Sequence, residues 1–312
     1  MRHLLSLADV GPDNLARLVR HSIAIASGRS DHEKPLAGKA VGILFRGTST
    51  RTRTAFTVGA QRLGASTIAY GPSDLQLATG ETFQDTGRVL SGFLDGLVIR
   101  TNGTIEEMKA LASQDRMGVI NAMSENEHPT QAIADLVTIQ EATGRLQGIH
   151  VLYLGEGNNS AAALALAVSM SPKMRLTLMM PKGYELQNSV IETALEFART
   201  TKAVIEHRHN ISDLPRDVDV VYTTRWQTMG VPKSDPSWKE KFKPYSVTKE
   251  LMAHVSRPSG TIFLHDLPAV RGEEVVDEVL DGSQSRAFRQ AQHKMTSAMA
   301  VLCWCVGNKS AG

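Results

Sequence analysis

From residue 40 onward, short apolar runs alternate with longer segments that place apolar residues at helical spacing. Most of the short runs are bounded by Gly, Pro, Asp or Asn, as strands commonly are. The runs predicted as strands are Ala40–Phe45, Ser66–Tyr70, Gly96–Arg100, Val119–Asn121, His150–Leu154, Arg175–Met180, Ala203–His207, Asp219–Thr223 and Thr261–Leu264. The segments between them that are predicted as helices are Arg53–Leu63, Asp85–Leu94, Pro129–Thr143, Ala161–Met170 and Leu186–Thr200. This alternation predicts an α/β fold with parallel sheets covered by helices on both faces.

The chain length predicts two domains. Its 312 residues exceed one ordinary hydrophobic core, and a domain typically holds about 150 residues. A predicted helix ends at Gly144 and a new strand begins at His150, so we place the boundary between them. We expect domains 1–145 and 146–312, each a doubly wound parallel sheet, joined by long helices. The last helix, around Ser283–Val306, is expected to pack back on the first domain, and the active site is expected in the interdomain cleft.

The composition is that of an ordinary soluble globular protein, with 42% hydrophobic and 21% charged residues. The net charge of +2, from 34 Lys and Arg against 32 Asp and Glu, is too small to indicate nucleic acid or an anionic membrane as a partner. No apolar run approaches the roughly 20 residues that a membrane span requires. The N-terminus also lacks the apolar core of a signal peptide. We therefore expect a cytoplasmic protein.

The two cysteines, Cys303 and Cys305, lie close to the C-terminus. A metal site usually needs a different spacing and more ligands, and a disulfide framework needs more cysteines. We expect both side chains to pack within a terminal helix, and we predict no metal site.

Three hydroxyls and two guanidiniums lie within five residues, shortly after the predicted strand that ends at Phe45. These residues are Ser49, Thr50, Arg51, Thr52 and Arg53. If they open a helix after a buried strand, the free backbone N–H groups and the positive end of the helix dipole point at the same spot as the side chains. Guanidiniums bind phosphate oxygens in pairs and stay charged at any working pH. The segment therefore predicts a phosphate cradle; the alternative is a Ser/Thr-rich turn before an exposed basic helix.

Functional sites in open parallel sheets gather at the carboxyl ends of the strands. Six polar stretches follow predicted strands here: the loop with Ser49–Arg53, Arg100, the turn before His128, Gly155–Ser160, Thr224–Gly230 and His265–Pro268. We expect them to face one cleft.

Four motifs occur in a characteristic order: Phe45–Thr54, Glu127–Gln131, Met229-Gly230 and His265–Ala269. The ordered set resembles the aspartate/ornithine carbamoyltransferase family, and more closely its ornithine branch, over essentially the whole chain. The resemblance implies that carbamoyl phosphate binds first and that an acceptor amine then attacks its carbonyl carbon, expelling phosphate and leaving a ureido product. It implies no metal or organic cofactor. It also implies a homotrimer in which each active site is completed by a loop from the neighbouring subunit.

The same resemblance assigns a first set of residues to carbamoyl phosphate, in domain 1–145 and beyond it: Ser49, Thr50, Arg51, Thr52, Arg53, Gln76, Arg100, His128, Gln131, Leu267 and Lys294. Gln76 falls in the loop that reaches the neighbouring subunit. His128 can donate to the carbonyl oxygen as that oxygen becomes negative, and Gln131 can accept from the carbamoyl NH2 group. Lys294 stands where the family has an arginine, so the charge is kept and the bidentate fork is lost.

A second set is assigned to the acceptor, in domain 146–312: Asn158, Asn159, Thr224, Arg225, Gln227, Thr228, Met229, Asp266 and Leu267. Here the chain departs from the ornithine branch, which has an aspartate at the position of Thr224, a serine at Thr228 and a cysteine at Asp266. Arg225 and Gln227 instead look like the aspartate branch, where these residue types bind carboxylates. We expect the acceptor to be ornithine or a related diamino acid.

The resemblance and the chemistry of the side chains together imply three catalytic residues, Arg100, His128 and Asp266. The Asp266 carboxylate could orient an incoming ammonium and accept its proton. Alternatively, it serves as a structural acceptor for nearby backbone N–H groups.

Two other classes of function stay open. One is a catalytically silent homologue that binds carbamoyl phosphate or another anion, although the charged residues of the first set are all present. The other is a dehydrogenase, because Gly155–Asn159 resembles part of a dinucleotide loop; the third glycine of that loop is missing, which argues against it.

Overall fold

The computed structural model describes residues 2–29, 34–227, 232–258 and 260–307. The chain forms two compact units: unit 1 comprises residues 1–137 and 292–312, and unit 2 comprises residues 138–291. Helix α5 (Pro129–Thr143) begins in unit 1 and ends in unit 2, whereas helix α11 (Ala287–Val306) begins in unit 2 and ends in unit 1. Two long helices thus connect the units along the chain.

Unit 1 is built on a four-stranded parallel sheet with the strand order β2-β1-β3-β4. The strands are β1 (Ala40–Phe45), β2 (Ser66–Tyr70), β3 (Gly96–Arg100) and β4 (Gly118–Met123). Every residue of β3 and β4 is buried, as expected for parallel strands covered on both faces. Phe45 pairs in register with Arg100, so the chain segments that follow β1 and β3 leave the sheet at the same edge.

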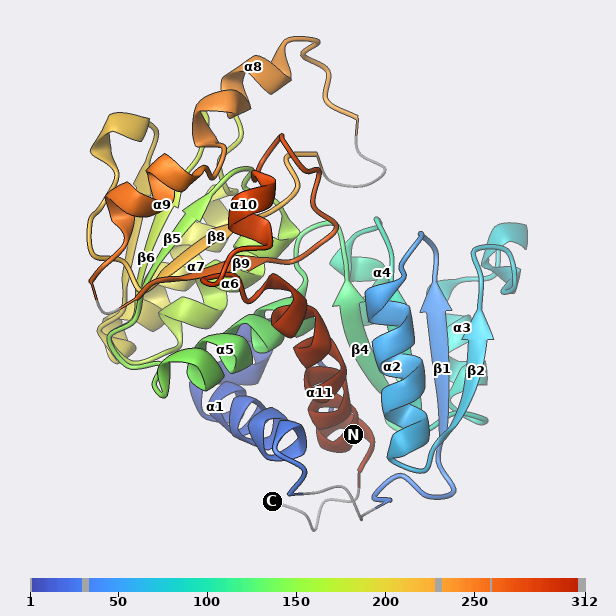
Figure 1. The fold of residues 1–312 in the computed structure, drawn as a ribbon. Helices are drawn as coiled ribbons and strands as arrows, with labels where there is room; N and C mark the ends of the chain where they lie inside the picture. The colour runs from blue at the N-terminus through green and yellow to red at the C-terminus, as the bar shows by residue number, and fades with distance from the viewer. Residues whose placement is uncertain (1, 30–33, 228–231, 259, 308–312) are drawn as a thin grey trace. The chain divides into compact units, whose positions relative to one another are not determined.

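Helices cover both faces of this sheet. They are α1 (Leu7–Ala26), α2 (Arg51–Arg62), α3 (Phe83–Leu90) and α4 (Ile105–Leu111), together with the short 3-10 helix η1 (Gln76–Thr79). Figure 1 shows α2 in front of the sheet, with α3 and α4 behind it. Leu90, Met108 and Leu111 from the latter two helices form one core cluster with Leu97 and neighbouring strand residues. This face of the sheet is therefore closed by α3 and α4.

Unit 2 is built on a five-stranded parallel sheet with the order β7-β6-β5-β8-β9. The strands are β5 (His150–Leu154), β6 (Arg175–Met179), β7 (Val204–Arg208), β8 (Val220–Thr223) and β9 (Ile262–His265). The chain winds outward from β5 in both directions, so the strand order reverses between β5 and β8. Such a switch point is where open parallel sheets bind ligands. The loops after β5, β8 and β9 share this edge, because Leu154 pairs with Thr223 and Thr223 with His265.

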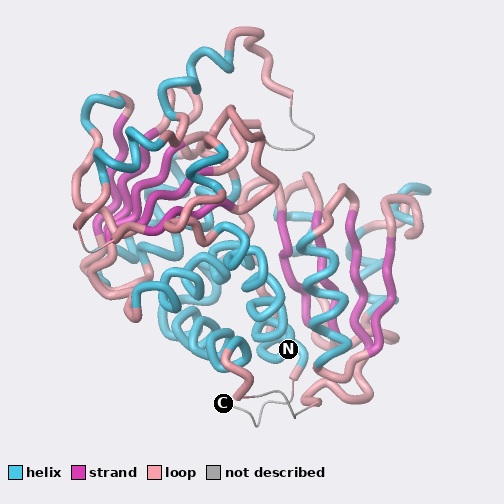
Figure 2. Tube along the Cα trace, viewed as in Figure 1, coloured by secondary structure: helices cyan, strands magenta, loops and turns pink. Residues whose placement is uncertain are grey.

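Helices also cover both faces of the second sheet (Figure 2). They are α6 (Asn159–Ser169), α7 (Asn188–Thr201), α8 (Trp238–Phe242), α9 (Lys249–Val255) and α10 (Asp277–Leu280), with the 3-10 helices η2 (Ile211–Asp213) and η3 (Lys243–Tyr245). Helix α6 is buried along its whole length, since it consists almost entirely of Ala, Leu, Val and Ser. On the other side, α9 and α10 contribute Leu251, Val255 and Val279 to a core cluster with Phe263 of β9.

The predicted α/β class with two doubly wound parallel sheets is confirmed. All nine predicted strands are present, with ends displaced by at most a few residues. The periodicity did not predict α4, α8, α9 and α10, which are four to seven residues long and too short for a clear helical pattern.

Candidate active site

The predicted phosphate cradle has the local structure that its chemistry requires. β1 ends at Phe45, and α2 begins at Arg51. Thr50 occupies the N-cap position of α2, but its side chain makes no capping hydrogen bond. The first N–H groups of the helix therefore have no side-chain cap, and the positive end of the helix dipole faces the same place. Thr52 is buried, Ser49 and Arg51 are half-buried, and Thr50 is exposed.

Arg53 lies in the first turn of α2 with its guanidinium turned back toward β1. Nη2 donates to the backbone oxygen of Phe45 at 3.5 Å, and the guanidinium carbon lies 5.3 Å from the centre of the Phe45 ring. The Nε atom is buried, and among the described residues no acceptor hydrogen-bonds to it. A buried donor of a charged group without an acceptor is rare in folded proteins. Arg53 thus offers an open N–H to an anion.

Arg100, His128 and Lys294 form a buried polar cluster in unit 1. Their exposed fractions are 6%, 5% and 8%. Burial lowers the pKa of His128 well below its ordinary value, and the charges of Lys294 and then Arg100 lower it further. The imidazole is therefore neutral at physiological pH and carries one ring N–H. Its Nδ1 lies 3.4 Å from the hydroxyl of Thr130; in the tautomer with the ring N–H on Nε2, Nδ1 accepts a hydrogen bond from that hydroxyl.

Gln131 connects this cluster to the interior of α5. Its Nε2 donates to the Asp135 carboxylate at 2.6 Å, and its Oε1 accepts a hydrogen bond from the Lys294 ammonium. Gln131 and Asp135 are fully buried. Lys294 therefore contacts a glutamine amide, and this contact fixes which end of the amide points toward the lysine. The i to i+4 spacing of Gln131 and Asp135 on a helix was a readable signal that the sequence analysis missed.

Glu127, the first residue of its motif, is a buried structural anchor. Its Oε1 accepts a hydrogen bond from the backbone N–H of Leu7 at 2.8 Å, which ties the start of α1 to the turn before α5. Burial raises the pKa of the Glu127 carboxyl to about 7, although hydrogen bonds from Ser6 and the Leu7 backbone oppose the rise. Glu127, which precedes His128, is thus fixed by a hydrogen bond with Leu7, 120 positions away in the chain.

Gln76 lies apart from this cluster, in the short helix η1. Its side chain is exposed, and its Oε1 accepts from the hydroxyl of Thr79 at 2.8 Å. No other hydrogen bond of its side chain is present among the described residues.

In unit 2, the turn after β5 is tightly held. Gly155 has a φ of 134°, which favours glycine. The N–H of Gly157 donates to the backbone oxygen of Tyr184 at 2.8 Å, and a Cβ atom at position 157 would lie 2.4 Å from the Glu185 backbone. Only glycine fits this approach. Asn158 caps α6 by accepting from the N–H groups of residues 160 and 161, and Asn159 is buried.

Asp266, just after β9, is held by two hydroxyls, one from the start of α6 and one from the residue that follows β8. Ser160 donates to its Oδ2 at 2.8 Å, and Thr224 donates to its Oδ1 at 2.9 Å. Its side chain is 14% exposed. Among the described residues, the hydrogen bonds that Asp266 accepts come from these two side chains and not from backbone N–H groups, as its alternative structural role would require. Ser160 was not assigned as a site residue, although it ends the polar stretch Gly155–Ser160 that the sequence analysis placed at the same edge as His265–Pro268.

The next residue, Leu267, has an unusual backbone held by a buried pair. Its φ is 53°, a region that a leucine rarely adopts, and its bond to Pro268 is cis. Its N–H donates to Nδ1 of His265 at 2.8 Å, so the His265 proton resides on Nε2 and is donated to Glu274 at 3.1 Å. His265 and Glu274 are both fully buried. Nothing in the sequence indicated the role of Glu274.

The remaining predicted acceptor residues lie elsewhere in unit 2. Arg225 and Gln227 line a small hollow of about 90 Å³ whose other lining residues are Trp226, Trp238, Lys239, Val270 and Glu273. Thr224 and Asp266 are not among its lining residues. Thr228 and Met229 lie outside the described residues.

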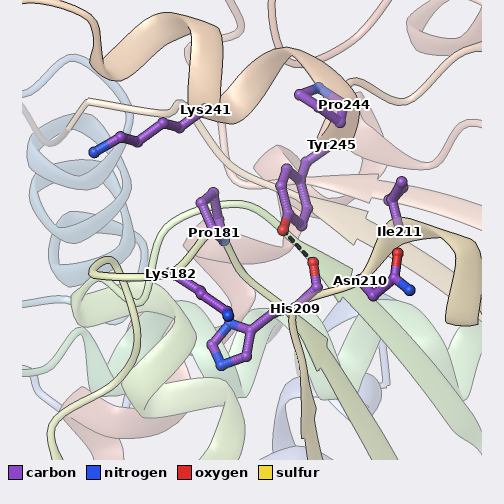
Figure 3. Close-up of a pocket in the computed structure, with 8 residues that line it drawn as sticks. All are labelled: Pro181, Lys182, His209, Asn210, Ile211, Lys241, Pro244 and Tyr245. Atoms are coloured by element: carbon purple, nitrogen blue, oxygen red, sulfur yellow. Dashed lines mark hydrogen bonds between the residues drawn. The ribbon is translucent and has the colours of Figure 1, made fainter.

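A larger hollow of about 480 Å³ lies at the carboxyl ends of β6 and β7. Its lining residues are Pro181, Lys182, His209, Asn210, Ile211, Lys241, Pro244 and Tyr245. Figure 3 shows the Lys241 ammonium pointing away from Tyr245, and Tyr245 donates to the backbone oxygen of His209. Lys241 instead pairs with Asp235 at 2.7 Å. The basic groups of this hollow do not converge on one point, and none of the predicted site residues lies in it.

The described residues contain no group of three or more His, Cys, Asp or Glu side chains arranged to hold a metal ion. In the same part of the chain, no helix combines the length and the apolar character needed to cross a bilayer.

Comparison with known proteins gives two adjoining family matches. The aspartate/ornithine carbamoyltransferase carbamoyl-P binding domain matches residues 2–141, and the aspartate/ornithine carbamoyltransferase Asp/Orn binding domain matches residues 147–305. The ornithine carbamoyltransferase of Caldicellulosiruptor saccharolyticus is 38% identical over 310 residues, which cover 98% of this chain and 99% of that protein. The ornithine carbamoyltransferase of Methanothermobacter thermautotrophicus is 38% identical over 308 residues, which cover 99% and 100%. The solved structure of ornithine carbamoyltransferase from Pyrococcus furiosus superposes with a TM-score of 0.90 at 33% identity, covering 98% of this chain and 97% of that one.

Proposed function

Because this chain belongs to the aspartate/ornithine carbamoyltransferase family, we propose that it moves the carbamoyl group of carbamoyl phosphate to the amine of an amino-acid acceptor, ornithine or a related diamino acid. The products are a ureido compound and phosphate. The observation that carries the proposal is the buried cluster of two cations around a neutral histidine in unit 1, formed by Arg100, Lys294 and His128. Such a cluster suits a small dianion with a polarised carbonyl group.

The phosphate group is bound by the start of α2. The uncapped N–H groups of the helix and the side chains of Ser49, Thr50, Arg51, Thr52 and Arg53 supply donors to its oxygens. Arg53 is the strongest single contributor in this assignment, because its buried Nε has no protein acceptor among the described residues. The ligand would satisfy that donor.

The carbonyl oxygen is polarised by Arg100 and His128. During transfer the amine nitrogen forms a bond to the carbonyl carbon, and the carbonyl π electrons move onto the oxygen. A neutral His128 that carries its proton on Nε2 donates a hydrogen bond to this oxyanion without giving up the proton. The electron pair of the oxyanion then re-forms the carbonyl bond as the bond to the phosphate oxygen breaks. Phosphate leaves with the electron pair of that bond and takes the remaining extra proton of the nitrogen.

The carbamoyl NH2 group requires acceptors. Gln131 is oriented for this role by its contacts with Lys294 and Asp135, because an amide oxygen can accept two hydrogen bonds. Lys294 then acts through Gln131. The backbone carbonyl of Leu267 is the second acceptor in this assignment, and its unusual φ is maintained by the His265–Glu274 pair.

In unit 2, the acceptor is bound by the strand ends. Asp266, oriented by Ser160 and Thr224, attracts the ammonium of the acceptor and takes its proton once the amine is bound. Asn158 and Asn159 bind the amino-acid end. Arg225 and Gln227 are assigned to a carboxylate, as in the aspartate branch, and Thr228 and Met229 to the acceptor by their place in the family motif.

The acceptor we propose is a carboxylate-bearing diamine other than, or in addition to, ornithine. The ornithine branch has an aspartate at position 224, where this chain has a threonine, and a cysteine at 266, where it has an aspartate. The carboxylate therefore follows β9 instead of β8, and Thr224 donates a hydrogen bond to it. A carboxylate moved to the neighbouring strand end changes the position at which an ammonium is bound.

We further propose that residues 1–145 form the carbamoyl phosphate-binding domain and 146–312 the acceptor-binding domain, a division that the two family matches support. The protein is proposed to be a cytoplasmic homotrimer. In that assembly, the exposed Gln76 would reach the active site of the neighbouring subunit.

The test is an assay of ureido product with carbamoyl phosphate and a panel of acceptors: ornithine, 2,4-diaminobutyrate, 2,3-diaminopropionate, aspartate and putrescine. Carbamoyl transfer to at least one diamino acid is expected, with a shorter diamino acid used at least as well as ornithine. A clear preference for ornithine would contradict the acceptor assignment and leave the reaction intact. Absence of phosphate release with every acceptor, while carbamoyl phosphate still binds in calorimetry, would favour the silent homologue.

A further inference from the structure

Lys233 is an almost fully enclosed lysine in unit 2 with no role in the assignments above. Its side chain is only 6% exposed. The ammonium lies 4.7 Å from the ring centre of Tyr184, 5.1 Å from that of Phe242 and 5.3 Å from that of Trp238. Three aromatic faces within about 6 Å of one ammonium form a cation cage. The cage formed by Tyr184, Phe242 and Trp238 is occupied by Lys233 of the same chain.

The open side of the cage is closed by Glu156. The Lys233 ammonium forms an ion pair and hydrogen bond with its carboxylate, which is 18% exposed. Because the Lys233–Glu156 ion pair is largely desolvated, removing one partner leaves the other charge buried, unpaired and poorly hydrated. Exposed pairs on the surface contribute little by comparison. Breaking the Lys233–Glu156 ion pair is therefore expected to change the conformation of the residues around it.

Glu156 belongs to the turn after β5 and is separated from Asn158 and Asn159 by Gly157 alone. The turn is fixed on its other side by the hydrogen bond from Gly157 to the backbone oxygen of Tyr184, whose ring is one wall of the cage. Lys233 thus contacts two residues that lie beside Gly157: it forms an ion pair with Glu156, and its ammonium lies over the ring of Tyr184. Without the ammonium, the Glu156 carboxylate loses its ion pair, whereas the Glu156 backbone oxygen still accepts a hydrogen bond from the Tyr153 hydroxyl and the Tyr184 ring still packs on Phe242.

The cage also connects to the segment after β8. Phe242 contacts Trp226, which is 3% exposed, with ring centres 5.7 Å apart. Trp226 stands between Arg225 and Gln227. One cluster of rings therefore supports both the turn with the two asparagines and the stretch with the arginine and glutamine.

We propose that Lys233 is a positioning residue for the acceptor: by occupying the aromatic cage and pairing with Glu156, it fixes the turn that carries Asn158 and Asn159. This inference rests on the proposed function, because it assigns those asparagines to the acceptor. Lys233 itself does not touch the reacting atoms. Its removal is expected to weaken acceptor binding and to leave carbamoyl phosphate binding, in unit 1, unchanged.

The principal variant is Lys233→Met, which keeps an unbranched side chain in the cage and removes the charge. We expect the KM for the acceptor that the panel identifies to rise about tenfold, the size of one lost charge-assisted contact. The KM for carbamoyl phosphate should stay within about twofold, since no assigned phosphate ligand contacts the cage. Lys233→Arg restores a cation over the rings and should recover most of the acceptor affinity.

The matched control is Lys241→Met. Lys241 lies on the same short helix as Phe242, and its ammonium is 5.8 Å from the same Tyr184 ring, but it is half-exposed and pairs with Asp235 on the surface. This variant should behave as the parent protein. Glu156→Gln, which keeps Lys233 in the cage, should raise the acceptor KM as Lys233→Met does. The double variant should be no worse than the more impaired single variant, because both single changes break one contact.

A readout without substrate separates this inference from the proposed function. Amide hydrogen exchange in the peptide covering residues 155–161 should accelerate in Lys233→Met and stay at the parental rate in Lys241→Met. Faster exchange in a protein that carbamoylates no acceptor would retain the positioning role and reject the proposed function. Unchanged exchange together with an unchanged acceptor KM would overturn the positioning role. If Lys233→Met does not fold, the Glu156→Gln variant decides by the same two measurements.

Discussion

The two units carry polar sites of opposite character. In unit 1, Arg100 and Lys294 bring positive charge to a neutral histidine, and the buried Nε of Arg53 has no acceptor among the described residues. In unit 2, the central group is the carboxylate of Asp266, held by hydroxyls. The first site suits a dianion and the second an ammonium.

The two sites also differ in how closely they follow the family motifs. The cradle residues 49–53, Arg100 and His128 match the family pattern, whereas Thr224, Thr228 and Asp266 depart from the ornithine branch. Carbamoyl phosphate is the same molecule in every member of the family, so its geometry limits what unit 1 can change. The residues assigned to the acceptor lie in unit 2, and their departures from the ornithine branch carry the proposed change of acceptor.

The largest expected effect is that of His128→Asn in unit 1. The variant keeps a short donor but cannot reach as far or hold the same ring geometry, so kcat should fall about 10²–10³-fold, as for other oxyanion donors. Because the pKa of His128 is lowered far below its ordinary value, the parent kcat should show no titration of this group between pH 6.5 and 8. Steady-state kinetics over that range measure both effects. A histidine-dependent fall in rate near pH 6.5 would contradict the neutral donor.

Asp266→Asn should act on the other substrate. The amide keeps the shape and the hydrogen bonds with Ser160 and Thr224 but loses the charge, so kcat/KM for the acceptor should fall about 10²-fold. The KM for carbamoyl phosphate should remain that of the parent. Calorimetry with carbamoyl phosphate alone provides the control. An equal loss of affinity for carbamoyl phosphate and for the acceptor would contradict the proposal that the two units bind different substrates.

Glu127→Gln tests the support of unit 1 without touching its ligands. The folded-state pKa of Glu127 is raised to about 7, so between its unfolded value and pH 7 the folded protein binds more protons than the unfolded one. Stability therefore falls as the pH rises through this window, and the cost is complete above pH 7. The glutamine variant should be more stable than the parent by about 1–2 kcal/mol at pH 8 and should lose this advantage below pH 4.5. Denaturant unfolding at the two pH values measures the difference; an advantage that grows toward acid would contradict the raised pKa.

The smallest effect is expected for Thr224→Ala. It removes one of two hydroxyl donors to Asp266, and Ser160 still orients the carboxylate. The KM for the acceptor should rise about threefold, which corresponds to less than about 1 kcal/mol. Ser160→Ala serves as the matched comparison and should have a similar effect. A loss for Thr224→Ala as large as that for Asp266→Asn would mean that Thr224 contacts the acceptor itself.

Much of the architecture could be predicted from local patterns. The strand runs of both sheets are short, apolar and bounded by turn-forming residues, so each could be located from neighbours in the chain. Residues 49–53 could be interpreted as a cradle because a strand that ends at Phe45 and a helix that begins at Arg51 fix their surroundings within a few residues.

Contacts between distant residues could not be predicted in this way. Ser160 and Asp266 lie 106 positions apart, and Lys233 and Glu156 lie 77 apart. Their pairing depends on which strands become neighbours, and neither composition nor periodicity carries that information. Lys233 in particular looks like a surface lysine in a loop of turn formers, because one wall of its cage, the Tyr184 ring, comes from a distant segment, while Trp238 and Phe242 come from α8.

The bare backbone at Gly157 limits how this scaffold can be redesigned. The Glu185 backbone occupies the space that a side chain at position 157 would need. Substitution of Gly157 is therefore expected to disrupt the fold of this turn and not to change the acceptor specificity. Libraries aimed at altered acceptors should leave this glycine intact and diversify positions 224, 225 and 266 on the adjacent strand ends.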